Sequence, residues 1–389
     1  MSASMLNALG EPVRPTLQQI PGDIACAADY ERHAVHHVQA QAWHHIQGGA
    51  DQNLTLAHNR KVFDQLRLLP QPIADVRAGH TRIHLLGHDL SSPLLLAPVA
   101  YQRLVHVEGE LAMVRAAMAL ETGMVVSTLS SYTLEEIAQA GRCAAEEMGH
   151  RAPRWFQLYL QADRVHSLQL LQRAQAAGYT AIVWTVDASI KRSGFPLPDG
   201  VEAANLRGMP VSRHTSPLQG PILFGTPGIQ QAPTWDDLRW LRAHTTLPLI
   251  VKGVLSAAQA RQAVALGADA VIVSNHGGRV LDGVVSPMEV LPHIVQAVGG
   301  QVPVLLDSGV RYGTDMVKAL ALGASAVLVG RPAMHALATA GLLGVAHLLH
   351  LLRAELELAM AHLGCATVAE VSAAVLMQDG GISQAAQSM

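Results

Sequence analysis

The chain is poor in cysteine and has no excess of charge of either sign. Its three cysteines, Cys26, Cys143 and Cys365, are scattered and odd in number, which argues against a disulfide framework and fits a reducing cytoplasm. Lys and Arg number 27 against 30 for Asp and Glu, a net charge of −3, and no basic stripe or acidic run is present. Nucleic acid is therefore not an expected partner.

Several kinds of segment and motif are also missing. The first residues, MSASMLNALGEPVRP, lack the basic and apolar regions of a secretory signal. The most apolar stretch, residues 336–352, is interrupted by His347 and His350, so we expect a buried or interface helix instead of a membrane span of about 20 apolar residues. No Walker-type loop and no dinucleotide-binding glycine fingerprint occur, so nicotinamide is not the expected cofactor. His33 and His37 have helical spacing, but no acidic residue completes a zinc motif, and no metal is expected.

Half of the residues are apolar, and from residue 92 onward they form a repeating pattern. Short apolar runs alternate with amphipathic segments that close on Gly123, Gly178, Gly267 and Gly323, where glycine favours a left-handed helix end. Continuous apolar runs are typical of parallel strands buried on both faces. The eight runs are residues 94–100, 124–129, 155–160, 180–187, 248–254, 269–275, 302–308 and 325–331. Eight βα units predict an α/β fold of the TIM (β/α)8 barrel type, with an open doubly wound sheet as the alternative.

We interpret the chain as a single domain, residues 1–389, built around this barrel. Residues 1–75 form an N-terminal helical cap, residues 92–335 the barrel, and residues 336–389 C-terminal helices. Residues 188–234, rich in Pro, Gly and Ser, are an insertion after the fourth strand. Because long loops after barrel strands overhang the active-site face, we predict that this insertion is a lid.

Seven of the eight apolar runs end in polar or charged side chains. The carboxyl ends of parallel barrel strands meet at one face, where active sites lie, so we expect a polar site there. The sixth run ends in SNHGGR, residues 274–279. An imidazole at His276 suits general-base chemistry near neutral pH, and Asp187, at another strand end, can fix its tautomer. Arg279 can hold a carboxylate with two parallel hydrogen bonds.

The last two runs indicate a phosphate site. DSGVR, residues 307–311, and GRP, residues 330–332, each place glycine and arginine directly after a strand. Barrels often bind phosphate at these two strand ends; the alternative is a pair of salt-bridged surface arginines, Arg311 and Arg331. Lys252 ends the fifth run, and a cation there can stabilise an anionic ring or form a Schiff base.

Taken together, these motifs resemble the FMN-dependent L-2-hydroxy acid oxidases and dehydrogenases. This family includes glycolate oxidase, lactate oxidase, lactate monooxygenase, mandelate dehydrogenase and the flavin domain of flavocytochrome b2. The resemblance runs from DYERHA, residues 29–34, to GRP and beyond. SNHGGR, Lys252 and LLDSGVRYGTD carry it most specifically, while FQLY and TVD add weaker support in the right order.

The resemblance implies a role for each site residue and FMN as the cofactor. His276 would take a proton from the substrate's C2 or from its hydroxyl, with Asp187 as its partner. Arg279 would bind the substrate carboxylate and Tyr159 the substrate hydroxyl. The flavin ring would meet Ser127, Gln157 and Thr185, with the Ala100 backbone near N5 and Lys252 at the N1–O2 edge. Asp307 would meet the ribityl chain, and Gly309, Arg311, Gly330 and Arg331 the phosphate.

The chain departs from the family pattern at three positions. His45 stands where the family usually has a tyrosine that helps to bind the substrate carboxylate, and imidazole can still donate a hydrogen bond. Leu129 replaces the tryptophan of glycolate oxidases and resembles the lactate-oxidising flavocytochrome. The family's second arginine after TVD has no clear counterpart; Lys191 and Arg192 lie near its place.

The resemblance predicts oxidation of a small, lactate-like L-2-hydroxy acid to the 2-oxo acid. Oxygen or another acceptor would re-oxidise the flavin, in a cytoplasmic homo-oligomer, expected to be a tetramer. Two alternatives stay open at this point. One is lactate 2-monooxygenase chemistry, which yields acetate and CO2, and the other is a flavin-binding protein with altered or lost activity.

Overall fold

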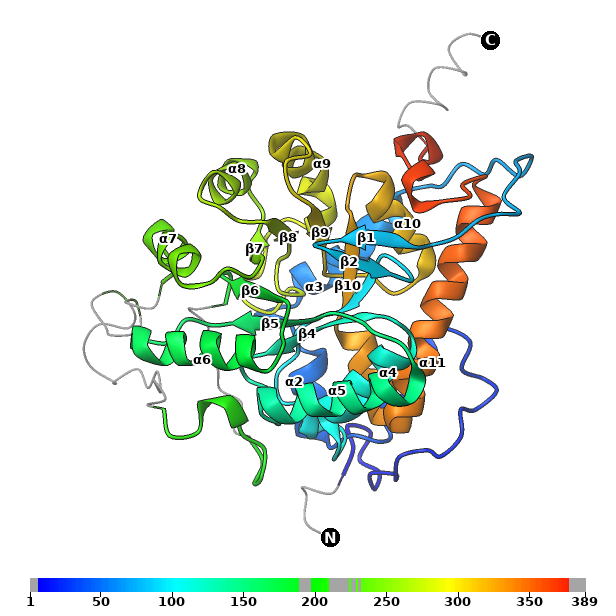
Figure 1. The fold of residues 1–389 in the computed structure, drawn as a ribbon. Helices are drawn as coiled ribbons and strands as arrows, with labels where there is room; N and C mark the ends of the chain where they lie inside the picture. The colour runs from blue at the N-terminus through cyan, green and yellow to red at the C-terminus, as the bar shows by residue number, and fades with distance from the viewer. Residues whose placement is uncertain (1–5, 189–196, 210–223, 225–228, 230–231, 378–389) are drawn as a thin grey trace.

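Eight parallel strands form a closed barrel at the centre of the molecule (Figure 1). The computed structural model describes residues 6–188, 197–209, 224, 229 and 232–377. Each predicted apolar run contains one barrel strand, and the strand order β10-β3-β4-β5-β6-β7-β8-β9 closes the ring. The predicted TIM barrel is therefore confirmed. The strands are β3 (Leu94–Leu96), β4 (Gly123–Ser127), β5 (Arg154–Leu158), β6 (Ala181–Thr185), β7 (Leu249–Val254), β8 (Ala270–Val273), β9 (Val304–Leu306) and β10 (Ala326–Val329).

The strands are mainly apolar because both of their faces are buried; polar side chains such as Gln157 and Lys252 stand near strand ends. One set of side chains fills the barrel interior, including Leu95, Val125 and Trp155. The alternate set, including Met124 and Phe156, packs outward against the helices. Side chains alternate between the two faces of a strand, so a strand buried on both sides needs apolar residues at every position.

Helices surround the barrel and follow the strands in turn. The prediction that helices close on glycine is confirmed at Gly178, Gly267 and Gly323, whose φ values are +85°, +92° and +97°. It is wrong at Gly123, which begins β4; a side chain there would lie 2.8 Å from Leu95. The helices are α4 (Gly109–Ala119), α5 (Leu134–Met148), α6 (Arg164–Ala176), α7 (Trp235–His244), α8 (Ala257–Ala265), α9 (Pro287–Val298), α10 (Gly313–Ala321) and α11 (Arg331–His362).

A short hairpin closes the amino-terminal end of the barrel, and the sequence pattern did not predict it. Strands β1 (Ile83–Leu85) and β2 (His88–Leu90) pair antiparallel. Leu85 and Leu90 are 2% exposed and join the cluster that fills the barrel interior. The hairpin therefore fills the amino-terminal end of the barrel with apolar side chains, and the polar strand-end groups lie at the carboxyl-terminal end.

The N-terminal segment supplies three helices, α1 (Ala27–Ala34), α2 (Ala40–Gln47) and α3 (Leu54–Gln65). The start of α3 meets the loop after β8, because Asp282 accepts hydrogen bonds from the backbone of Leu54 and Thr55. Of the part of the chain that is described, α11 alone is long and apolar enough to cross a membrane by length and composition. Its apolar window is 67% buried, and α11 packs against α1, α4 and α10, as core helices do.

The predicted lid lies partly outside the described residues, and so do Lys191 and Arg192. Its longest described part, residues 197–209, is anchored near the loop that follows β4. Asn205, which is 1% exposed, donates to the Ser130 hydroxyl at 2.8 Å and accepts from the Leu134 backbone at 2.9 Å. This part of the insertion therefore lies at the carboxyl end of the strands.

Candidate active site

His276 stands directly after β8 in a strained backbone conformation. Its φ is +57°, a region that non-glycine residues rarely occupy outside functional sites and turns. The backbone N–H of His276 donates to the Ser274 hydroxyl at 3.0 Å, and its ring Nδ1 lies 2.8 Å from the Asp187 Oδ1 atom. The predicted pairing of His276 with Asp187 is present in the structure. Burial favours the neutral acid, but the charges of His276 and Lys252 outweigh it and lower the pKa of Asp187.

Lys252 connects this pair to the neighbouring strand end. Its ammonium lies 3.0 Å from the Asp307 carboxylate and donates to the Ser274 hydroxyl at 2.8 Å. Burial lowers the pKa of Lys252, but Asp307 and then Asp187 raise it above its ordinary value. Lys252 is thus a buried cation held charged by two carboxylates. Sequence reasoning missed Ser274 and the Lys252–Asp307 ion pair, although Ser274 begins the SNHGGR motif.

Arg279, which the sequence predicts to bind a carboxylate, is held in place by backbone carbonyl groups. Its Nη1 atom donates to the carbonyls of Ile46 and Gly48 at 3.0 and 2.9 Å, and its Nη2 atom donates to the His45 carbonyl at 2.7 Å. Guanidinium has five N–H donors, so two remain beyond these three bonds, the number that a bidentate carboxylate contact needs. His45 thus meets Arg279 through its backbone carbonyl.

Arg331 binds the same backbone turn, residues 46–48, that Arg279 binds. It donates to the carbonyls of Ile46, Gly48 and Gly277, each at 3.0 Å. Burial, followed by the charges of Arg279 and Arg311, lowers the pKa of Arg331. Burial also lowers the pKa of Arg311, which donates to the Val310 carbonyl at 2.9 Å. Among the described residues neither arginine forms a salt bridge and both are half-buried, which contradicts the alternative of salt-bridged surface arginines and leaves a cationic pocket, here meaning the cluster of Arg311 and Arg331, whose charge suits a phosphate.

The predicted glycines border this pocket. Gly309 has φ +97°, and a side chain there would lie 2.7 Å from the Asn59 carbonyl. Gly330 precedes the first residue of α11, so the amino end of that helix faces the loop after β10. Helix amino ends carry unpaired N–H groups and a partial positive charge, which suit an anion.

A row of small polar groups lies at the ends of β4, β5 and β6. Ser127 donates to the Gln157 Oε1 atom at 3.1 Å. The Gln157 Nε2 atom and the Thr185 hydroxyl are buried and have no hydrogen-bond partner among the described residues. Buried polar groups are rarely left unpaired, so these atoms indicate a missing polar ligand. The edge of a flavin ring, with its carbonyl and N–H groups, fits them.

Tyr159 and Leu129 lie at the side of this row. The Tyr159 backbone N–H donates to Thr128 at 3.0 Å, and the Leu129 carbonyl accepts from the Tyr101 backbone at 3.0 Å. Burial and then the charge of Asp187 raise the pKa of Tyr159, while Arg279 lowers it. The phenol therefore stays protonated as a hydrogen-bond donor within electrostatic range of both charged groups. Ala100 precedes Tyr101 in the same loop.

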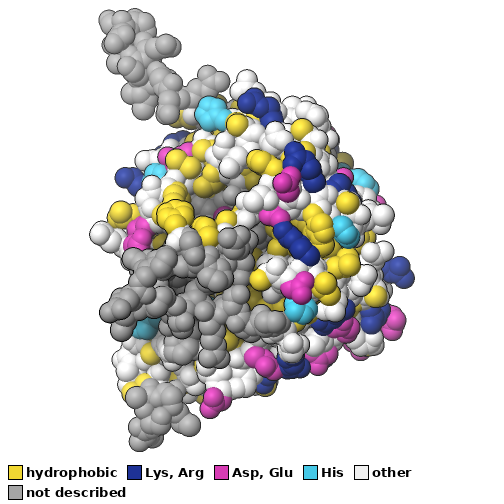
Figure 2. All heavy atoms as spheres, turned by 90° about the vertical axis from the view of Figure 1, so that its left-hand side faces the viewer, with side chains coloured by type: hydrophobic (Ala, Val, Ile, Leu, Met, Phe, Trp, Pro, Cys, Tyr) yellow, Lys and Arg dark blue, Asp and Glu magenta, His cyan; other side chains and the backbone are white. Residues whose placement is uncertain are grey.

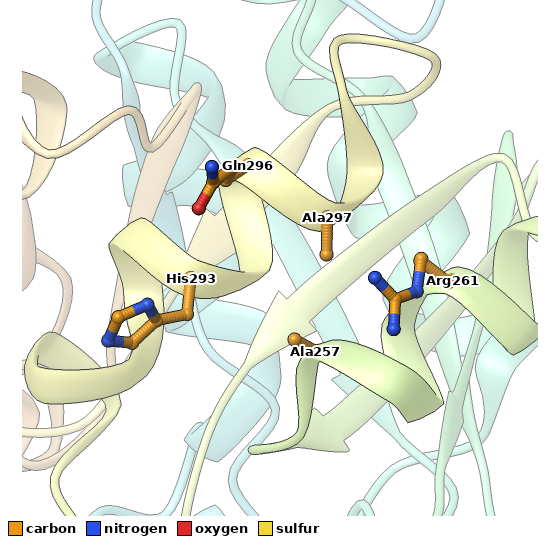
Figure 3. Close-up of a pocket in the computed structure, with 5 residues that line it drawn as sticks. All are labelled: Ala257, Arg261, His293, Gln296 and Ala297. Carbon is orange, nitrogen blue, oxygen red and sulfur yellow. The ribbon is translucent and has the colours of Figure 1, made fainter.

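One groove on the outer surface lies away from the strand ends. A groove of about 380 Å³ lies between α8 and α9, lined by Ala257, Arg261, His293, Gln296 and Ala297 (Figure 3). It contains none of the strand-end residues. On the face shown in Figure 2, acidic, basic and apolar side chains are mixed and neither charge gathers in one place. The described residues include no group of three or more His, Cys, Asp or Glu side chains placed to hold a metal ion.

Comparisons with known proteins match this fold and site. Residues 34–378 match the model of the FMN-dependent dehydrogenase family. An L-lactate oxidase from Alicycliphilus denitrificans is 49% identical, covering 91% of this chain and 96% of that protein. A 4-hydroxymandelate oxidase from Amycolatopsis orientalis is 43% identical over 88% of this chain and 95% of its own length. A solved structure of mandelate oxidase with benzoyl-formic acid has a TM-score of 0.80 and 41% identity, covering 91% of this chain and 98% of that chain.

The chain therefore belongs to the FMN-dependent dehydrogenase family. It is a barrel oxidoreductase that uses FMN to oxidise 2-hydroxy acids to 2-oxo acids. The half-buried cations Arg311 and Arg331 and the unpaired amide and hydroxyl atoms described above fit the phosphate and the ring of FMN.

Proposed function

We propose that the protein oxidises a small L-2-hydroxy acid, with L-lactate as the best substrate, and that oxygen is the electron acceptor. The products are then the 2-oxo acid and hydrogen peroxide. The observation that carries this proposal is the His276–Asp187 pair at 2.8 Å, which lies at the barrel mouth beside the half-buried guanidinium of Arg279. A base next to a carboxylate-binding cation suits removal of a proton from a 2-hydroxy acid.

In the proposed mechanism, Asp187 accepts the Nδ1–H of His276 and leaves Nε2 as the nitrogen that takes the substrate proton. The carboxylate also stabilises the imidazolium that forms, as an aspartate does beside a catalytic histidine. Oxidation at C2 removes two electrons and two protons; His276 takes one proton, and bound FMN would take the two electrons together with the other proton. His276 keeps the abstracted proton while the oxidised acid leaves.

Arg279 and Tyr159 orient the substrate. The two remaining N–H donors of Arg279 bind the carboxylate, and the protonated Tyr159 phenol donates to the oxygen at C2. Lys252 would lie near the flavin N1–O2 edge, where its positive charge would stabilise negative charge on the ring. Ser127, Gln157, Thr185 and the Ala100 backbone would hold the ring, while Asp307 would meet the ribityl chain and Gly309, Arg311, Gly330 and Arg331 would hold the phosphate.

Two observations support lactate as the substrate. Relatives at 49%, 43% and 42% identity are named L-lactate oxidase. Leu129, at the side of the site, is smaller than the tryptophan expected in glycolate oxidases and leaves room for the substrate's methyl group. The mandelate oxidase structures, at 40–41% identity, make an aromatic substrate the main competitor.

An anaerobic reduction experiment tests the substrate. Purified FMN-loaded protein is mixed without oxygen with L-lactate, D-lactate, glycolate or (S)-mandelate, and the loss of flavin absorbance is followed. L-Lactate should reduce the flavin fastest and D-lactate should not reduce it. Faster reduction by mandelate would contradict the proposed substrate, and no reduction by any 2-hydroxy acid would contradict the activity.

Product analysis in air tests the acceptor. Pyruvate and hydrogen peroxide in equal amounts would agree with oxidase chemistry. Acetate and CO2 would identify a monooxygenase, and slow re-oxidation in air would point to a different acceptor.

We also propose that the protein acts in the cytoplasm as a homotetramer. The family resemblance and the scattered cysteines support this expectation. Light scattering of the purified protein checks the assembly, because four 41.3 kDa chains differ clearly in mass from one or two.

A further inference from the structure

Gly253 lies in β7 at a break in the ladder with β8. Lys252 pairs with Ile272 and Val254 pairs with Val273, so Gly253 is the extra residue of a β-bulge. Its φ is +105°, a conformation that residues with side chains rarely adopt. Bulges next to active sites often re-aim neighbouring side chains.

The space beside Gly253 is filled by the side chain of Asp187. A Cβ atom at position 253 would lie 2.6 Å from both Cβ and Cγ of Asp187 and 2.8 Å from its Oδ2 atom. The two strand ends are also tied together, because the Val186 N–H donates to the Lys252 carbonyl at 2.9 Å. Asp187 thus packs directly on bare backbone.

Hydrogen bonds alone do not fix the Asp187 carboxylate. Its Oδ1 atom bonds the His276 ring, but its Oδ2 atom is buried without a hydrogen-bond partner in the described part of the chain. One hydrogen bond leaves the carboxylate free to rotate about the Oδ1 contact. The surface of Gly253 blocks that movement on one side.

We propose that Gly253 is a positioning residue, whose missing side chain and bulged backbone set the distance between Asp187 and His276. This inference rests on the proposed role of the His276–Asp187 pair. A methyl group at position 253 forces the carboxylate away from His276. Misplacing a catalytic group by about 1 Å can lower a rate by roughly 100-fold.

The test compares Gly253→Ala with Gly178→Ala in the FMN-loaded protein. Gly178 also has a left-handed φ, +85°, but a Cβ atom there meets nothing within 4 Å, so it reproduces the backbone strain without the contact. Flavin content and the anaerobic rate of flavin reduction by L-lactate are measured across pH. Gly253→Ala should slow reduction by roughly 10- to 100-fold with FMN still bound, while Gly178→Ala stays close to the unmodified protein.

The pH profile separates positioning from a general structural effect. The negative charge of the Asp187 carboxylate favours the protonated form of His276. Moving the carboxylate away should therefore shift the acid limb of the profile, where the rate falls as His276 is protonated, to lower pH. The other charged and titratable groups around the pair, Lys252, Arg279 and Tyr159, stay in place. An unchanged limb in a slowed variant would contradict the proposal.

A double-mutant cycle with Asp187→Asn distinguishes failure of this inference from failure of the proposed function. If Asp187→Asn alone has no effect, the role of Asp187 is wrong. If it slows reduction, Gly253→Ala should add little in that background, and an equal effect in both backgrounds would refute positioning. If Gly253→Ala fails to fold, adding Asp187→Gly should restore folding, because the clash between the new methyl group and the Asp187 side chain is then gone. A double variant that still fails to fold would refute the proposed role of Gly253.

Discussion

The ion pair between Lys252 and Asp307 allows a quantitative prediction. We consider Lys252→Met, which keeps a long side chain and removes the charge. The pair is 3.0 Å apart, with side chains 4% and 10% exposed. Removing the cation leaves the Asp307 carboxylate buried, and among the described residues only the Ser308 hydroxyl, at 2.8 Å, still donates to it. The Ser274 hydroxyl also loses the hydrogen bond that it accepts from the ammonium.

The magnitude follows from burial. Breaking a buried pair by removing one partner costs about 3–5 kcal/mol, because the other charge stays uncompensated. The matched control is Arg353→Met, since Arg353 and Glu357 are also 3.0 Å apart but are 36% and 51% exposed. An exposed helical pair of this kind contributes only about 0.3–0.5 kcal/mol. Although the two ion pairs have the same length, their removal should lower the free energy of unfolding by amounts that differ roughly tenfold.

Urea unfolding of FMN-free protein measures both costs without the contribution of bound cofactor. The pKa of Lys252 is raised in the fold, so its contribution is fully present below the ordinary lysine pKa and is lost only as pH rises through the raised value. The cost of Lys252→Met should thus be constant from pH 6 to pH 9. A cost no larger than that of Arg353→Met would refute this account of the pair.

Three further predictions concern the base, the phosphate pocket and a buried acid. Asp187→Asn should slow anaerobic flavin reduction by roughly 10³-fold, because two unit charges about 4 Å apart interact by about 4 kcal/mol at an effective dielectric of 20. The control is Asp89→Asn, in an exposed His–Asp pair at 2.9 Å, which should have no effect on the rate. Arg331→Met should weaken FMN binding, followed by flavin fluorescence, by roughly 10- to 100-fold, since one charge-assisted contact contributes about 1.5–3 kcal/mol; unchanged affinity would exclude it from the phosphate pocket. Burial raises the pKa of Glu110 despite its backbone hydrogen bonds. The unmodified protein should therefore lose stability relative to Glu110→Gln as the pH rises from the ordinary glutamate pKa through the raised pKa. A difference in unfolding free energy that does not change with pH would contradict this.

The sequence predicts the barrel well because strands that are buried on both faces appear as continuous apolar runs. Strands such as β8 are apolar at every position, and the glycine after a helix, as at Gly178, follows from its left-handed φ. The β1–β2 hairpin was missed because its strands have three residues each, too few to show a period. Its apolar contribution is only Leu85 and Leu90.

The site was predictable in composition but not in its internal contacts. Topology alone brings the strand ends together, which is why His276 and Asp187 were paired correctly across 89 residues. The Lys252–Asp307 ion pair depends on side-chain direction at a bulge, which no periodicity records. The backbone carbonyls that hold Arg279 were not predicted, because the path of the N-terminal helices toward it lies outside the barrel pattern.

The charges at the barrel mouth show why this site needs anionic ligands. Among the described residues Lys252 has a carboxylate partner at 3.0 Å, but Arg279, Arg311 and Arg331 form no salt bridge and bind only backbone carbonyls. Even partial burial of a cation without a counter-charge is costly, so this arrangement is not explained by stability of the fold. In the proposed function, a substrate carboxylate at Arg279 and a dianionic phosphate at Arg311 and Arg331 would supply the missing negative charge. Because Arg279 and Arg331 share the carbonyls of Ile46 and Gly48, one turn of the N-terminal segment holds both binding sites in register.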